Sequence, residues 1–80
     1  MDLNVYIDKE AERNELSRNL IVELRKISHD AEFIYGVLLD VENDEDKETL
    51  LEYIKNGENV SFSQIILNAL WLSEQRKKRG

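Results

Sequence analysis

Hydrophobic residues recur with a helical period over most of the chain, and this pattern predicts a mainly α-helical fold. The clearest stretch lies between Asp8 and Ser28, where apolar positions recur every three or four residues and share one helix face. The apolar residues on that face are Leu16, Leu20, Ile21, Leu24 and Ile27. Asp is a favoured N-cap residue, so we predict one helix that begins after Asp8 and ends near Ser28.

The first residues follow a different pattern, in which apolar and polar side chains alternate. Leu3, Val5 and Ile7 are separated by Asn4 and Tyr6, and a period of two is typical of extended chain. We therefore predict a short extended segment at the N-terminus.

Residues 30–41 fit two interpretations. A helix capped by Asp30 would gather Phe33, Ile34, Val37, Leu38 and Val41 on one face and leave Tyr35 and Leu39 on the other. A strand would instead present Phe33, Tyr35, Val37, Leu39 and Val41 on one side, with Ile34, Gly36 and Leu38 behind. Gly costs a helix about 1 kcal/mol relative to Ala, but no Pro interrupts the run. The helix is the preferred interpretation, and the strand is the alternative.

Two further helices are predicted in the C-terminal half. Acidic residues at 44–46 suit a helix N-terminus, and the helix that follows turns Leu50, Leu51 and Ile54 inward. We expect Gly57 to end it in the left-handed conformation.

The last helix has the most specific local signal in the chain. Ser61 and Gln64 have the spacing of a capping box, and Val60 with Ile65 fits a hydrophobic staple. The helix should therefore begin at Phe62, and the four basic residues at 76–79 should complement the dipole at its end.

Length and charge restrict the classes of protein that fit. The chain has 80 residues, a net charge of −6 and no Cys, which indicates one small domain over residues 1–80 and excludes thiolate chemistry. Residues 30–58 hold ten acids and two bases, a balance that disfavours nucleic acid and favours a basic protein partner. No apolar run approaches the roughly 20 residues that a membrane span needs. The expected location is the cytoplasm.

The acidic middle of the chain does not match a known metal loop. An EF-hand that started at Asp40 would need Gly and Glu where the chain has Glu45 and Leu51. His29 is the only histidine, and no Gly-rich phosphate loop is present. We therefore predict no enzyme, no metal and no cofactor. The acids form a candidate face for a basic partner, made up of Asp40, Glu42, Asp44, Glu45, Asp46 and Glu48.

The last helix carries more apolar residues than one core-facing stripe needs. Its expected stripe spans about 160° and contains Phe62, Ile65, Ile66, Ala69, Leu70 and Leu72. Leu67 and Trp71 lie one turn apart outside that stripe, and Tyr35 with Leu39 is a similar surplus on the segment 31–41. The two surpluses either cover each other or form a candidate interface with a second copy or another protein.

Residues 50–79 resemble the helix-turn-helix half of the ribbon-helix-helix repressors. The resemblance rests on Asn56-Gly57, on Val60 to Ser63, on Ile65-Ile66 and on Ala69-Leu70. It implies an obligate dimer whose paired strands, taken from residues 34–41, enter a DNA groove, with residues 61–63 near phosphate. That strand would carry no Arg, Lys, Gln or Asn to contact base edges.

Together, these patterns predict a bundle of three to four short helices with an extended N-terminal segment. The expected function is that of a small acidic, non-catalytic binding or regulatory protein that acts through protein–protein contacts, including those of a homodimer. The alternative is an α+β ribbon-helix-helix dimer that regulates transcription.

Overall fold

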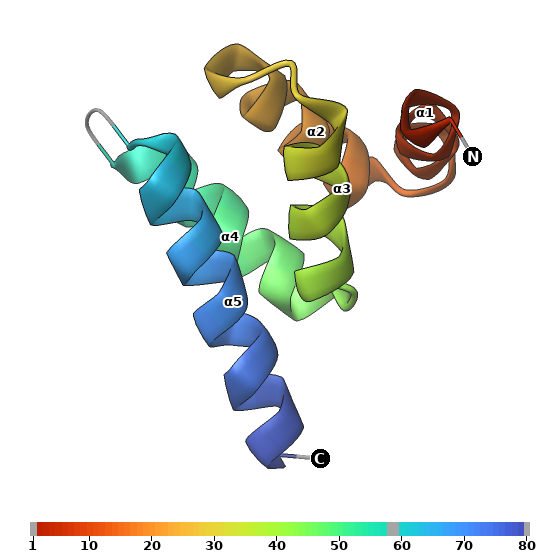
Figure 1. The fold of residues 1–80 in the computed structure, drawn as a ribbon. Helices are drawn as coiled ribbons and strands as arrows, with labels where there is room; N and C mark the ends of the chain where they lie inside the picture. Colours follow the sequence, from red (N-terminus) through yellow and green to blue (C-terminus); the bar gives the residue numbers. More distant parts are fainter. Residues whose placement is uncertain (1, 58–59, 80) are drawn as a thin grey trace.

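A computed structural model describes residues 2–57 and 60–79, which form five α-helices and no strand (Figure 1). The helices are α1 (Leu3–Arg13), α2 (Glu15–Ile27), α3 (Ala31–Asp40), α4 (Asp44–Asn56) and α5 (Phe62–Arg79). The predicted mainly α-helical fold is therefore confirmed. The predicted number of helices is too low, and the α+β alternative is wrong for the described residues.

The N-terminal segment is helical, so the predicted extended segment is wrong. Asp2 caps α1 by accepting a hydrogen bond from the Asn4 amide at 3.0 Å. Ile7 is completely buried, whereas Val5 is 48% exposed. The alternation of five residues was misleading because Leu3 and Ile7 are also one helical turn apart and can share an inward face.

Asn14 divides the helix that was predicted to run from Asp8 to Ser28. Its extended backbone (φ −140°, ψ 120°) ends α1, and its Oδ1 accepts from the Ser17 amide at 3.1 Å to cap α2. Its Nδ2 donates to Asp44 Oδ1 at 3.1 Å, which ties this corner to the start of α4. Asn is a strong N-cap residue, so a single side chain can end one helix and begin the next.

Residues 31–40 form a helix, so the preferred interpretation is confirmed and the strand is wrong. Asp30 caps α3 by accepting from the Glu32 amide at 3.0 Å. The apolar face is buried as predicted and consists of Phe33, Ile34, Val37 and Leu38, with Val41 buried at the C-cap.

Gly57 ends α4, but not in the left-handed conformation that was predicted. Its backbone is extended, at φ −81° and ψ 134°. A Cβ at this position would collide with Val60 Cγ2 and would lie 3.0 Å from the Tyr53 carbonyl oxygen. The close return of the chain after α4 therefore favours glycine over any residue with a Cβ at this position.

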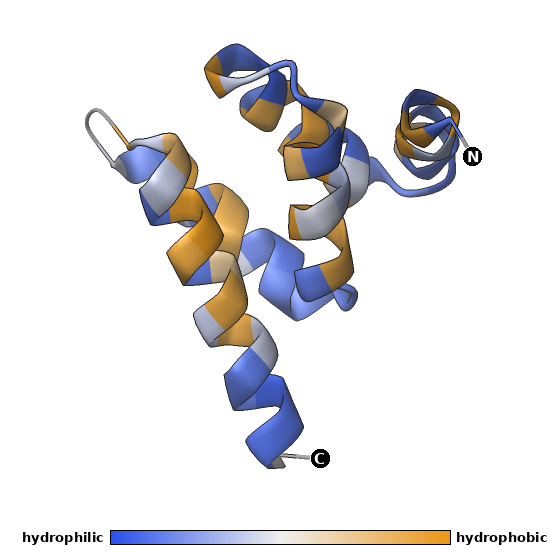
Figure 2. Cartoon of the chain, in the orientation of Figure 1, coloured by the Kyte–Doolittle hydropathy of each residue, from blue (hydrophilic) through white to orange (hydrophobic). Residues whose placement is uncertain are grey.

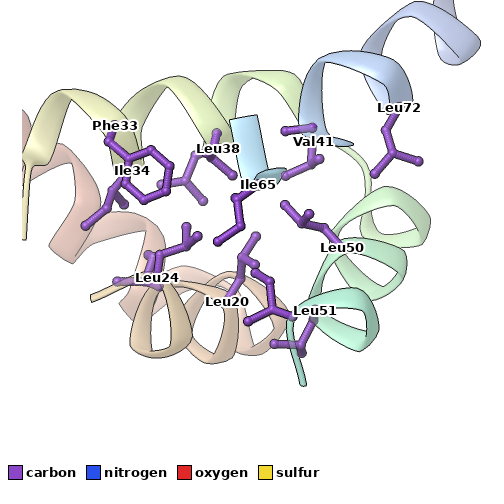
Figure 3. Close-up of a cluster of buried hydrophobic side chains, with 14 of the residues drawn as sticks. Leu20, Leu24, Phe33, Ile34, Leu38, Val41, Leu50, Leu51, Ile65 and Leu72 are labelled. Carbon is purple, nitrogen blue, oxygen red and sulfur yellow. The ribbon is translucent and has the colours of Figure 1, made fainter. Parts of the chain in front are cut away.

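One hydrophobic cluster draws residues from all five helices, and α5 supplies its centre. Figure 3 shows Ile65 projecting between Leu38 and Val41 of the α3 segment and Leu50 of α4. Ile65 is completely buried. The start of α5 also lies against the start of α3, where the rings of Phe33 and Phe62 are 4.3 Å apart. α5 is therefore fixed along one side only, with its remaining surface turned away from the core (Figure 1).

Candidate functional site

The N-terminus of α5 is fixed by the predicted capping box. The Ser61 amide donates to Gln64 Oε1 at 2.8 Å, and the Gln64 amide donates to Ser61 Oγ at 3.2 Å. Val60 packs against the same core cluster to which the buried Ile65 belongs, and the two residues hold the positions of the predicted staple. These contacts fix the residue at which α5 begins.

The buried stripe of α5 is narrower than predicted. Ile65, Ala69 and Leu72 are buried, and so is Ser73. Phe62, Ile66 and Leu70 were predicted to face the core, but they are exposed by 41%, 39% and 46%. The reason is that α3 and α4 approach α5 from adjacent directions and cover less of its circumference than the apolar pattern spans.

Five large apolar side chains therefore share one exposed surface, which we call the α5 face. It consists of Phe62, Ile66, Leu67, Leu70 and Trp71. Leu67 is 66% exposed and Trp71 is 55% exposed, the two highest values among the large hydrophobic residues that the structure describes. They form one ridge of residues four apart, and Ile66 with Leu70 forms the neighbouring ridge. Figure 2 shows this apolar part of α5 followed by a hydrophilic C-terminal end.

A hollow of about 190 Å³ lies at the edge of the α5 face, between α3 and α5. Its lining residues are Glu32, Phe33, Gly36, Val37, Asp40 and Ile66. A Cβ built on Gly36 would have no atom within 4 Å, so the missing side chain helps to open this space. Its lining combines apolar side chains with the carboxylates of Glu32 and Asp40.

The charges near the α5 face are arranged along its length. Burial raises the pKa of Asp40 above its usual value, while the nearby cations Lys77 and Arg76 act to lower it. Glu74 is exposed one turn beyond Leu70. The face thus begins at a helix N-terminus, carries one acid near its end and finishes in basic residues.

Tyr35 and Leu39 do not join Leu67 and Trp71 in one interface. Tyr35 packs edge-on against Tyr6 of α1, with ring centroids 4.9 Å apart at 83°. Leu39 is 41% exposed on the same side of α3. The two apolar surpluses therefore do not cover each other, and Leu67 and Trp71 stay uncovered.

The six acids of the candidate acidic face are not equivalent. Asp46 is buried, and its Oδ2 has no hydrogen-bond partner among the described residues. Asp44 accepts from Asn14, and Asp40 is partly buried next to Lys77. The three exposed glutamates are Glu42, Glu45 and Glu48. Within residues 2–57 and 60–79, no three acids or histidines are grouped closely enough to hold a metal ion.

A second, polar hollow of about 530 Å³ lies between α1, α3 and the start of α4. Sequence reasoning missed it because its residues come from three separate segments, among them Tyr6, Glu10, Asn14, Glu42 and Lys47. The Lys47 side chain is only 7% exposed, and its Nζ lies 3.9 Å from Asp44 Oδ1. Glu10 already pairs with Arg13 at 3.0 Å. Burial, followed by the charge of Glu10, raises the pKa of Tyr6. The lining has mixed charge and no His, Ser or Thr nucleophile.

No helix in the described part of the chain is both long enough and apolar enough to cross a bilayer. Comparison of the sequence with models of protein families and with curated proteins, and comparison of the structure with solved structures, finds no match.

Proposed function

We propose that this protein is a non-catalytic binding module whose working surface is the α5 face. The observation that carries the proposal is the exposure of five large apolar side chains on one helix of a chain whose core is small. Single exposed hydrophobic residues are ordinary, but contiguous apolar patches of a few hundred Å² mark interaction surfaces.

The size of the surface supports this function. Large apolar side chains have roughly 150–250 Å² of surface each, so the measured exposures leave on the order of 500 Å² open to solvent. Burying that area against an apolar partner of equal size gains roughly 25 kcal/mol at about 25 cal/mol per Å². Association costs an estimated 4–15 kcal/mol in lost freedom, so the gross gain is sufficient.

The residue types also support binding. Trp is the residue most enriched among interface hot spots, and Trp71 is 55% exposed on the α5 face, one turn from Leu67. The hollow next to Ile66 offers a recess for a side chain of the partner. Neither hollow holds an arrangement of nucleophile and base that would support catalysis.

DNA binding by paired strands is not the function that we propose. Both segments that could supply such a strand, residues 3–7 and 34–41, lie almost wholly within the helices α1 and α3. The resemblance of residues 50–79 to the ribbon-helix-helix proteins stays a prediction.

Position-specific photocrosslinking in the cells that make the protein tests the proposed function. A benzophenone amino acid at Leu67 should give a covalent adduct, because this side chain is the most exposed part of the α5 face. The same group at Val22 is the matched control, since Val22 is 49% exposed but lies on α2. Absence of an adduct at Leu67, or equal adducts at both positions, would contradict the proposal.

A further inference from the structure

We infer that the partner on the α5 face is a second copy of this chain, packed antiparallel across a two-fold axis near residues 68 and 69. This inference rests on the proposed function, because it names the occupant of the same surface. Two-fold dimers are the commonest oligomers, and they require a surface that is complementary to itself.

The α5 face meets this requirement in the antiparallel direction. When two helices run in opposite directions, a residue before the axis faces the residue that lies equally far after it. An axis at the level between Asn68 and Ala69 places Leu67 opposite Leu70 of the second copy, and Ile66 opposite Trp71 of the second copy. Each pair occurs twice, so both exposed ridges of α5 are covered by apolar residues along their length.

The charges at the two ends of α5 favour the same direction. The axis places Glu74 of one copy opposite Ser63 of the other, within the first turn of α5. A carboxylate is stabilised there by the free amides and the positive end of the helix dipole. Lys77 of the second copy then lies on the side where α3 carries Glu32. A parallel pair would instead place Arg76, Lys77 and Lys78 of both copies side by side, and these like charges repel.

The available area agrees with a stable dimer. Two α5 faces contribute on the order of 1,000 Å² of apolar surface, and specific interfaces bury about 1,200–2,000 Å² in total. The polar residues around the seam, such as Ser63 and Glu74, supply the remainder. The hollow lined by Gly36 and Ile66 lies at the edge of the seam.

Solution mass and tryptophan fluorescence test the inference together. Light scattering should give about twice the monomer mass of 9.4 kDa and a smaller value on dilution. Trp71 is the only tryptophan, so its emission should shift to the blue as the dimer forms. Leu67→Glu should give monomers at every concentration, whereas Val22→Glu, at an exposed site on α2, should stay dimeric. Circular dichroism of both variants checks that they are folded.

Cysteine pairing tests the direction of packing, because the chain has no cysteine of its own. With the antiparallel arrangement, Ser63→Cys and Glu74→Cys should each give little disulfide alone but a linked dimer when mixed. A parallel pair would link each variant with itself and would overturn the arrangement.

A monomer at all concentrations, with Trp71 emission unchanged, would overturn the second copy as partner. The photocrosslinking result then separates the two proposals. An adduct at Leu67 whose mass shows a different protein would leave the binding function standing and would refute only the homodimer.

Discussion

Replacing Gly36 and Gly57 by alanine should change the free energy of unfolding in opposite directions, although the chemical change is the same. Gly36 lies inside α3, and a Cβ built there has no atom within 4 Å. Alanine is favoured over glycine in a helix interior by about 1 kcal/mol, chiefly because it loses less backbone freedom on folding. Gly36→Ala should therefore stabilise the protein by about 0.5–1 kcal/mol.

Gly57→Ala gains the same entropic advantage, but the structure has no room for the added Cβ. The new Cβ would collide with Cγ2 of Val60, a β-branched residue that packs against the core and cannot easily rotate away. Overpacking of this kind costs about 1–3 kcal/mol. The net effect of Gly57→Ala should be a destabilisation of about 0.5–2 kcal/mol.

Thermal melts followed by circular dichroism measure both effects. For a domain of this size, 1 kcal/mol corresponds to a change in Tm of roughly 4–8 °C. Gly36→Ala should raise Tm and Gly57→Ala should lower it. If both variants raise Tm, the packing around Gly57 is wrong, and if both lower Tm, the open space at Gly36 is wrong.

Three further predictions follow from the caps, the charges and the family resemblance. Ser61→Ala should destabilise the protein by about 1 kcal/mol. The double variant Ser61→Ala/Gln64→Ala should be destabilised by less than the sum of the two single variants, because each side chain accepts a hydrogen bond from the backbone amide of the other residue. Strictly additive changes in the urea midpoint would contradict the capping box. The folded state raises the pKa of Asp40, mainly through burial, so ionisation of Asp40 weakens folding. Asp40→Asn should therefore be more stable than the parent at pH 7 and should lose this advantage as the pH falls through the folded-state pKa of Asp40. A difference in Tm between the two proteins that grows towards acid pH would refute this assignment. No DNA duplex should be retarded by the protein at low salt, and binding that weakens steeply with salt would instead favour the ribbon-helix-helix alternative.

The parts of the fold that could be predicted were those coded by neighbouring residues. The start of α5 followed from Ser61 and Gln64 alone, because a capping box is a contact across three residues. α3 followed from its helical period, since the apolar face of that segment is what the core buries. The break at Asn14 was missed because α1 contributes few buried residues and its polar middle gives no period to follow.

The candidate site could be predicted only in part, for a different reason. Leu67 and Trp71 stood out from the sequence because they fall outside any single stripe. The exposure of Phe62, Ile66 and Leu70 depends on how much of α5 the helices α3 and α4 cover, and that is a property of packing between distant segments. The edge contact of Tyr35 with Tyr6 likewise joins two helices that no local pattern relates.

The central place of Ile65 in the core has a consequence for biosynthesis. Residues 2–57 contain four of the five described helices, but the cluster between α3 and α4 lacks its middle until α5 has been synthesised. The helix that completes the core also carries the exposed apolar face. A nascent chain that still lacks α5 is therefore without the middle of its core and without the α5 face, and the apolar residues of α3 and α4 that Ile65 covers stay open to solvent.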